Sequence, residues 1–185
     1  GVGCEGPHHA FIVIGTAGHD SCRMRRGHSM AEHRITPLND SFVDCDVLGT
    51  VDSVTFAVTG TSHFSDMVSD ARRQRRVVEH ATIDWIVVRN RLSMLGSRNK
   101  RLVGEGLQEL SFRLGFRAVD GFAERVIFRE FYPRGLTALD TPDEDTHGTR
   151  QSRSHVTARQ EAETRLRALT RPLAQRGLRP AAAPR

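Results

Sequence analysis

The sequence predicts an α/β fold built on a mostly parallel sheet. Apolar, β-branched runs at Ala10–Ile14 and Ile83–Val88 have the composition of strands that are buried on both faces. Helical periodicities at Ser65–His80 and Arg98–Leu114 alternate with such runs, an order that is typical of βαβ units. About four strands are expected in all, which would leave one edge of the sheet open.

The chain has 185 residues, enough for one domain with a sizeable core, and 38% of them are hydrophobic. Its formal net charge is +5, and every basic residue except Lys100 is an arginine. Arginine richness can follow the base composition of a gene, so by itself it is weak evidence for nucleic-acid binding.

Three cysteines, Cys4, Cys22 and Cys45, show neither a paired number nor a CxxC spacing. They therefore predict neither a disulfide framework nor a zinc site, and a reducing cytosol is the expected compartment. No signal peptide is recognisable, and no apolar run approaches the ~20 residues that span a bilayer.

The first part of the chain predicts a strand followed by a glycine-rich turn. Residues 1–9 form an irregular segment, after which Ala10–Ile14 leads into Gly15–Asp20. Such a turn can bring backbone N–H groups to a phosphate, although an ordinary turn is the favoured interpretation. Cys22–Arg34 is basic and His-rich without a clear apolar face, so no stable helix is expected there.

A short strand is expected at Arg34–Leu38, with a turn or helix cap at Asn39–Ser41. Three aspartates follow in the stretch to Val58, and solvated loop carboxylates are favoured over a metal site for them. Ser65–His80 predicts a helix whose apolar stripe includes Val77 and Val78. Its four arginines within Arg72–Arg76 favour a solvated face, or alternatively a surface for an anionic partner.

The central expectation concerns Ile83–Val88, which ends in the polar residues Arg89–Arg91. Open α/β sheets bind ligands at the carboxyl ends of their strands, and the basic helix start Arg98–Arg101 lies just beyond. That helix is amphipathic as far as Leu114, and Gly115 provides its stop.

Two further short strands are expected at Phe116–Val119 and Arg125–Phe128. The α/β domain is expected to cover residues 10–140, followed by a polar linker at 141–154. Residues 155–185 are expected to form a C-terminal helix, with Leu166 and Leu169 packed on the body, and a flexible tail.

Three long strings carry a resemblance to a known family: ITPLNDSFVDCDVLGTVDSVT (Ile35–Thr55), DWIVVRNRL and GFAERVIFREFYPRGLTALD. With them the chain resembles the MipZ family, the division-plane positioning ATPases of the MinD/ParA group, over Phe11–Asp140 and more weakly at Arg159–Glu161. The resemblance implies the C-terminal part of a doubly wound, mostly parallel P-loop NTPase-like sheet. It further implies a dimer that binds ATP and Mg²⁺, nucleoid DNA without sequence preference, ParB and FtsZ, in the cytoplasm at the nucleoid.

The resemblance also implies which residues would meet the nucleotide. Asn90 matches the family's adenine-contacting Asn, and an amide can both donate to and accept from a base edge. The remaining positions carried over are the base-pocket residues Phe131, Tyr132 and Pro133 and the turn residues Thr16 and Gly18.

For DNA, the resemblance implies contacts through Arg98, with Lys100 and Arg101 beside it, and through Arg125. Several cations on one face would give an affinity that falls steeply with salt.

The chain departs from the family pattern at the phosphate and metal elements. The family's phosphate loop would lie upstream of Ala10 and has no counterpart in the sequence, and Gly15 stands where the family has a magnesium-holding Asp. We therefore expect a partial ATPase without catalytic or metal-ligating residues and without appreciable ATP hydrolysis. The alternatives are a non-enzymatic remnant that binds DNA or protein, and an unstable fragment without function.

Overall fold

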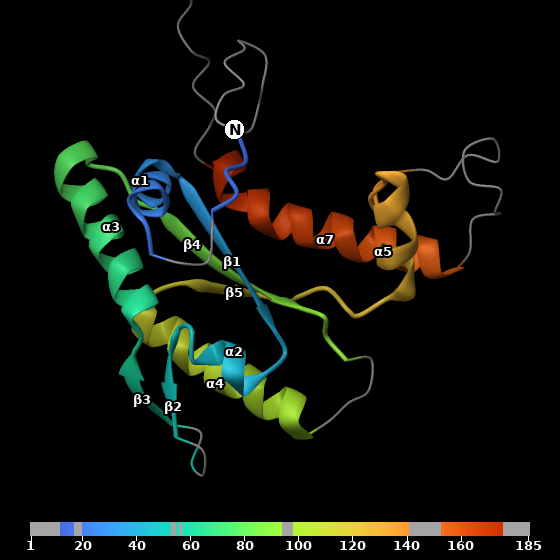
Figure 1. Cartoon of the computed structure of the whole chain (residues 1–185), viewed down its shortest axis with the longest axis horizontal. Helices are drawn as coiled ribbons and strands as arrows, with labels where there is room; N and C mark the ends of the chain where they lie inside the picture. Colours follow the sequence, from blue (N-terminus) through green and yellow to red (C-terminus); the bar gives the residue numbers. More distant parts are fainter. Residues whose placement is uncertain are drawn as a thin grey trace, which may run out of the picture.

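A parallel sheet of three strands, in the order β1–β4–β5, organises the computed structural model of the chain (Figure 1). The strands are β1 (His33–Asn39), β4 (Asp84–Asn90) and β5 (Arg117–Val119). The structure describes residues 12–16, 20–52, 55, 57–93, 98–140 and 153–175.

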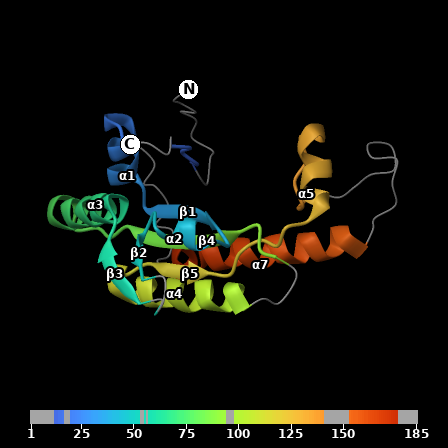
Figure 2. The same ribbon diagram turned by 60° about the horizontal axis from the view of Figure 1, so that its bottom comes forward.

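Helices and a small separate hairpin surround this sheet. The hairpin pairs β2 (Gly49–Val51) with β3 (Val58–Thr61) in antiparallel fashion, and the sequence did not predict it. In both views α3 and α5 lie at opposite ends of the molecule (Figures 1 and 2). The helices are α1 (Cys22–Met30), α2 (Phe42–Cys45), α3 (His63–Glu79), α4 (Arg98–Leu114), α5 (Val126–Phe131), the 3₁₀ turn η1 (Tyr132–Arg134) and α7 (Arg153–Gln175).

The central strand β4 confirms the prediction of a run buried on both faces. Trp85, Ile86, Val87 and Val88 are each at most 4% exposed. Trp85 stacks obliquely on Phe116 at 5.2 Å between ring centres, and its indole N–H donates to Thr36 on β1. Side chains of the central strand are therefore buried on both faces of the sheet. Its last residues lie at the end of the sheet where the strands have their carboxyl ends.

The main core contains the face of β4 that carries Trp85 and Val87, together with residues of β1, α3 and α4. The predicted helix at Arg98–Leu114 is confirmed, and Gly115 ends it with a φ of 67°. The buried members of this core are Leu38, Cys45, Leu48, Val58, Val68, Trp85, Val87, Val103, Leu107, Leu110 and Phe116.

The helix predicted at Ser65–His80 is also confirmed, as α3, and Ser62 caps its first turn. Its apolar stripe is shorter than expected. Met67 and Val68 are buried, whereas Val77 and Val78 are each 70% exposed, so the described residues leave the apolar side chains near the end of α3 uncovered.

The strand predicted at Ala10–Ile14 is not formed by its described residues, Ile12–Ile14. They have no regular secondary structure and are strongly exposed, Val13 at 94%. A strand needs a hydrogen-bonding neighbour, and β1, the edge strand of the described sheet, pairs only with β4. Apolar composition alone therefore misassigned this run.

Cys22–Arg34, where no stable helix was expected, contains α1. Ser21 accepts a hydrogen bond from the Met24 N–H at the start of the helix. Met24 and His28, four residues apart, provide its buried side, and the Arg75 guanidinium donates to the Ala31 carbonyl just beyond its end. Caps and neighbours replace the missing apolar stripe.

The segment predicted as a strand at Arg125–Phe128 forms the start of helix α5. Ile127 and Phe131 lie one helical turn apart and pack with Ala138 and Ala158 in a second, smaller core. The β-branched and aromatic composition favoured a strand, but burial at a spacing of four residues favours a helix.

Helix α7 covers this second core through small residues. Ala158 is fully buried, whereas Leu166, expected to pack on the body, is 49% exposed. Within the part of the chain that the structure describes, no helix is both long and apolar enough to cross a membrane.

Candidate functional site

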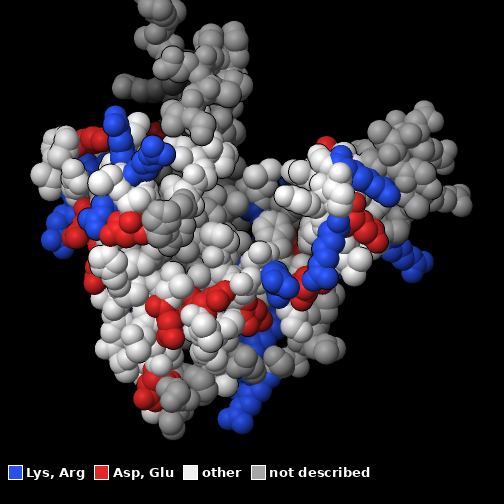
Figure 3. All heavy atoms as spheres, in the orientation of Figure 1, with Lys and Arg blue, Asp and Glu red and all other residues white. Residues whose placement is uncertain are grey.

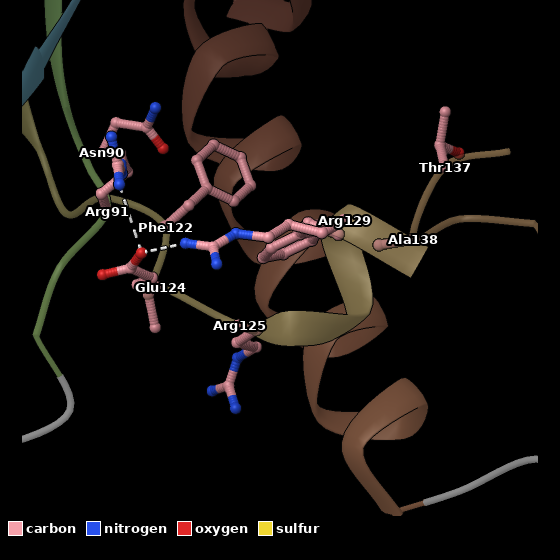
Figure 4. A pocket seen from close by; sticks show the side chains of 11 residues that line it. Asn90, Arg91, Phe122, Glu124, Arg125, Arg129, Thr137 and Ala138 are labelled. Carbon is pink, nitrogen blue, oxygen red and sulfur yellow. Dashed lines mark hydrogen bonds and ion pairs between the residues drawn. The ribbon is translucent and has the colours of Figure 1, made fainter. Parts of the chain in front are cut away.

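A pocket of about 700 Å³ opens beside the carboxyl end of β4, the edge at which open α/β sheets bind ligands (Figure 4). Its volume lies within the range of small-molecule sites. Four parts of the chain meet there: the end of β4, the loop after β5, α5 with the turn beyond it, and α7. The lining residues are Asn90, Arg91, Phe122, Ala123, Glu124, Arg125, Phe128, Arg129, Thr137, Ala138 and Ala162.

The loop at residues 120–125, which we call the pocket loop, runs against the end of β4. The Phe122 N–H donates to the Arg89 carbonyl, and Leu92 exchanges backbone hydrogen bonds with Phe122 and Glu124, each at 2.9 Å. Gly121 makes this approach possible, since a Cβ there would lie 1.6 Å from the Arg89 carbonyl oxygen. On this side, backbone hydrogen bonds hold the pocket loop against the end of β4.

Arg89 holds the strand ends together beneath the pocket. Its guanidinium forms an ion pair with Asp40, which follows β1, and donates to the Lys100 carbonyl at the start of α4. The side chains of Arg89 and Asp40 are 15% and 8% exposed. Breaking such a buried pair by removing one partner is strongly destabilising, so this ion pair supports the geometry of the edge.

The rim of the pocket carries a shared ion pair. The Glu124 carboxylate accepts from Arg91 at 3.3 Å and from Arg129 at 2.5 Å (Figure 4). One carboxylate against two guanidinium groups leaves one positive charge in excess at the mouth. All three side chains are between 44% and 68% exposed, so this arrangement affects a ligand's charge more than the protein's stability.

The apolar part of the pocket consists of aromatic and small side chains. The rings of Phe122 and Phe128 meet edge to face, 6.4 Å apart at 86°. Ala123, Ala138 and Ala162 leave the space beside them open. Such a surface suits a flat aromatic group, and the Asn90 amide beside it can donate and accept hydrogen bonds.

Of the residues expected to meet a nucleotide, Asn90 lies on the pocket wall, exposed at the end of β4. Phe131, Tyr132 and Pro133 follow the pocket-lining part of α5 but are not among its lining residues. Phe131 is buried against the His155 ring at 4.7 Å, and Tyr132 is 84% exposed. Their role at a base stays a prediction.

The turn residues lie elsewhere. Gly15 and Thr16 are exposed, and a Cβ on Gly27 of α1 would lie 3.5 Å from the Thr16 methyl group. Gly18 lies outside the described residues. The structure thus brings neither Gly15 nor Thr16 to the pocket at the end of β4.

Arg98, Lys100 and Arg101 stand in the first turn of α4. Arg98 is exposed, Lys100 donates to the Ser93 carbonyl at 2.9 Å, and Arg101 forms an exposed pair with Glu105. No acidic residue lies in this turn. Cations at a helix N-terminus oppose the helix dipole, so helix stability does not account for them.

Arg125, also expected at DNA, is held inside the protein. Its Nε donates to Glu161 of α7 at 2.8 Å, and the two side chains are 17% and 11% exposed. In Figure 4 this side chain points away from Asn90. A guanidinium so enclosed has little surface for a phosphate, so its role at DNA stays a prediction with less support than that of Arg98.

The basic face of α3 is partly structural. Arg72 donates to the last carbonyl of α4, that of Leu114, and burial lowers the pKa of its guanidinium. Arg75 donates to Ala31 at the end of α1. Arg73 and Arg76 remain exposed and form no ion pair with the described residues, and Figure 3 shows basic side chains gathered over α1 and α3.

A smaller hollow of about 300 Å³ lies between α1 and α3, with His28 among its lining residues. His28 is 7% exposed, and its Nδ1 finds no hydrogen-bond partner among the residues that the structure describes. Burial, and then the charge of Arg34, lower the pKa of His28 to about 4. Burial also lowers the pKa of Arg34 to about 10, while its guanidinium lies 4.6 Å from the centre of the Phe64 ring.

Sequence reasoning placed Arg91 at the end of the central strand, but among the pocket residues it assigned a binding role only to Asn90 and Arg125. It missed the Arg91–Glu124–Arg129 rim and the Phe122–Phe128 wall, although all five lie in strings that carry the family resemblance. The one signal available in the sequence was the high frequency of aromatic and charged residues in segments that follow a predicted strand. Among the described residues, no group of three or more His, Cys, Asp or Glu side chains is placed to hold a metal ion.

In a comparison with known protein families, residues 5–173 fit the model of the family described as ATPase MipZ. Among curated proteins, none matches the chain.

Proposed function

Because the chain belongs to the MipZ family of ATPases, we propose that it takes part in positioning the division plane and binds the base of ATP in the pocket beside Asn90. One observation carries the proposal: an apolar, aromatic pocket with an exposed amide at the carboxyl end of the central parallel strand. The Asn90 amide would pair with the edge of the base, and the Phe122–Phe128 wall would contact its flat face.

The positive excess at the rim suits the charge of the nucleotide. Arg91 and Arg129 share one carboxylate, so an anionic ligand meets net positive charge at the mouth of the pocket. The described residues offer no cluster for Mg²⁺, and we assign no step of hydrolysis to them. The expectation that this chain hydrolyses no appreciable ATP stays a prediction, which phosphate release by the purified chain would test.

Titration of the chain with a fluorescent ATP analogue tests the site directly. We expect binding by the unaltered chain and a loss of about 3–10-fold in affinity for Asn90→Ala, the size of one neutral hydrogen bond. Asn39→Ala is the matched control, since Asn39 is the register partner of Asn90 at the exposed end of β1 but does not line the pocket. A folded chain that binds no analogue, or an equal loss in both variants, would contradict the proposal.

A second candidate function, binding of nucleoid DNA, rests on the first turn of α4. We propose that Arg98 and Arg101 contact phosphates, because cations there lower rather than raise the stability of the helix. Arg73 and Arg76 offer a further exposed basic surface on α3. Without a base-reading element assigned, such contacts would carry no sequence preference.

DNA binding measured across a range of salt concentrations tests this candidate. Replacing both Arg98 and Arg101 with Ala should reduce the slope of log K against log salt by about 2, one phosphate contact for each residue. Arg113→Ala in the last turn of α4 removes an exposed arginine paired with Glu109 and should leave the slope unchanged. Equal slopes in all three proteins would sink the DNA proposal.

The family resemblance also leads us to propose ParB, FtsZ and a second copy of the chain as protein partners, with the complex located at the nucleoid. Co-sedimentation of the chain with each purified partner, with and without ATP, tests them one at a time. If a partner does not co-sediment with the chain either with or without ATP, the proposed interaction with that partner is contradicted.

A further inference from the structure

The pocket loop contributes Phe122, Ala123, Glu124 and Arg125 to the pocket, so its path decides the shape of the site. Beyond one isolated bridge between Ala123 and Leu92, it has no regular secondary structure. One side of the loop is held by the end of β4. Its other side is held by α7.

Two of the contacts between the loop and α7 are made by a single carboxylate, that of Glu161. One oxygen of Glu161 accepts from the Ala123 N–H at 2.6 Å, and the other accepts from the Arg125 Nε at 2.8 Å. Since the Glu161 side chain is only 11% exposed, water cannot readily replace either bond. Glu161 thereby holds both the backbone of the loop and the direction of its last side chain.

Two neighbours on α7 complete the contact. Arg165, one turn further on, donates to the Gly121 carbonyl at 3.0 Å, at the position where the loop crosses β4. Ala162, next to Glu161, lines the pocket itself. One turn of α7 therefore contacts the loop at its start, its middle and its end.

We propose that Glu161 is a positioning residue for the pocket: it holds the pocket loop in the shape that forms the ligand site, and so couples the docking of α7 to ligand binding. The nature of the ligand, an adenine nucleotide, rests on the proposed function. The hold of Glu161 on the loop does not rest on it.

The chemistry of the contact sets what each substitution removes. Glu161→Ala leaves the Ala123 N–H without its acceptor and the enclosed Arg125 without its counter-charge, and the loop must open to bring both to water. Glu161→Gln keeps an acceptor oxygen of the same reach but loses the charge. If Glu161 merely filled space, only the volume of the replacement would matter. Glu161→Gln, which is isosteric, would then behave like the unaltered chain, and only Glu161→Ala would differ.

Hydrogen exchange of the full chain, followed by mass spectrometry, tests the inference. We expect amides in residues 121–125 to exchange at least about tenfold faster in Glu161→Ala than in the unaltered chain, with an intermediate rate in Glu161→Gln. Exchange in β4 and α4 should stay unchanged. Glu163→Ala is the matched control, because Glu163 also lies on α7 but pairs within the helix with Arg159 at half-exposed positions.

Binding of a fluorescent ATP analogue to the same four proteins supplies the second readout. Affinity should fall in the order of the exchange rates, with Glu161→Gln restoring part of what Glu161→Ala loses. Unchanged exchange at 121–125 in Glu161→Ala would overturn the inference, and so would faster exchange with unaltered affinity. If the unaltered chain binds no nucleotide, the proposed function fails, and the exchange at 121–125 alone decides the inference.

Discussion

His28 is the buried side chain whose ionisation should make the stability of this protein depend on pH. Its ring is buried on α1, beside the hollow between α1 and α3, and both burial and the nearby Arg34 charge disfavour the imidazolium. Asp20, which favours the charged form, is already paired with Arg25 and His63. The folded protein therefore keeps His28 neutral where the unfolded chain would take up a proton.

The sign of the effect follows from the lowered pKa. Between the ordinary value of 6.5 and the folded value of about 4, the unfolded state binds the extra proton, so the stability that is present above pH 6.5 is lost as the pH falls through this window. Thermal melting between pH 7.5 and 4.5 should show a decline of roughly 2–4 °C for each kcal/mol lost. His28→Gln should flatten the decline.

His80→Asn serves as the control, because His80 is exposed and Asn tolerates its left-handed φ of 52°. An equally steep decline in His28→Gln and His80→Asn would show that His28 is not responsible.

For single residues, the sequence predicted correctly the positions that depend on local composition alone. Asn90 was placed correctly at the exposed end of a buried strand, because strand ends can be read from the sequence. The ion pair between Glu124 and Arg91 could not be predicted from the sequence, because the two residues lie on different elements and meet only once β4 and β5 are paired. Arg125 looked like a free cation until the fold placed Glu161 against it.

Gly121 is the residue on which the connection from β5 to α5 depends. An added Cβ would overlap the Arg89 carbonyl at 1.6 Å, and neither backbone can move without breaking the hydrogen bonds that join them. Gly121→Ala should therefore lower the free energy of unfolding by at least about 3 kcal/mol and open the pocket loop. Urea denaturation measures the first effect, and binding of the ATP analogue measures the second.

Gly106→Ala is the control of opposite sign. A Cβ on Gly106 meets no atom within 4 Å, and alanine in the middle of α4 should raise stability by about 1 kcal/mol. Similar losses in both variants would mean that the close approach at Gly121 is not the cause.

Among helices and strands, periodicity succeeded where the element carries its own apolar stripe, as α4 does with Val103, Leu107 and Leu110. It failed for α1, whose stability comes from Ser21 and from the Arg75 guanidinium of another helix. It also failed for Val126–Phe131. The β-branched residues at the start of this segment favoured a strand, and a single pair of buried positions was too weak a signal for a helix. Elements held by their neighbours cannot be recognised from local sequence alone.

Among the described residues, the long strand β1 lies at one edge of the three-stranded sheet, and no described segment pairs with its outer side. Ile35 on β1 is 51% exposed, and the separate run Ile12–Ile14 is apolar and exposed as well. Unpaired edges and apolar patches favour association between chains. In the absence of nucleotide we expect the chain to self-associate in a concentration-dependent manner.

Sedimentation velocity at rising concentration tests this expectation. Replacing both Val13 and Ile35 with Lys should lower the association constant at least tenfold, since charge on an edge blocks pairing. Phe112→Lys changes an apolar residue of α4 that is 90% exposed, and should have little effect. Association that responds alike to both changes would argue against the edge as the contact.

The parallel, alternating architecture was predictable because βα order constrains topology. The strand order β1–β4–β5 was not, and neither was the β2–β3 hairpin, whose short strands lie in a stretch of mixed composition. The pocket needed four segments from β4 to α7 at once, so only its starting edge could be predicted.

The pairing of β1 with β4 joins His33 to Asp84, about 50 residues further along the chain. During synthesis at roughly 5–20 residues per second, β1 therefore leaves the ribosome several seconds before β4 does. In that interval α1 and the β2–β3 hairpin can already form, while the side chains of Leu38 and Thr36 remain exposed to solvent. Chaperone capture of the nascent chain should accordingly rise once β1 has left the ribosome and fall soon after β4 has followed it.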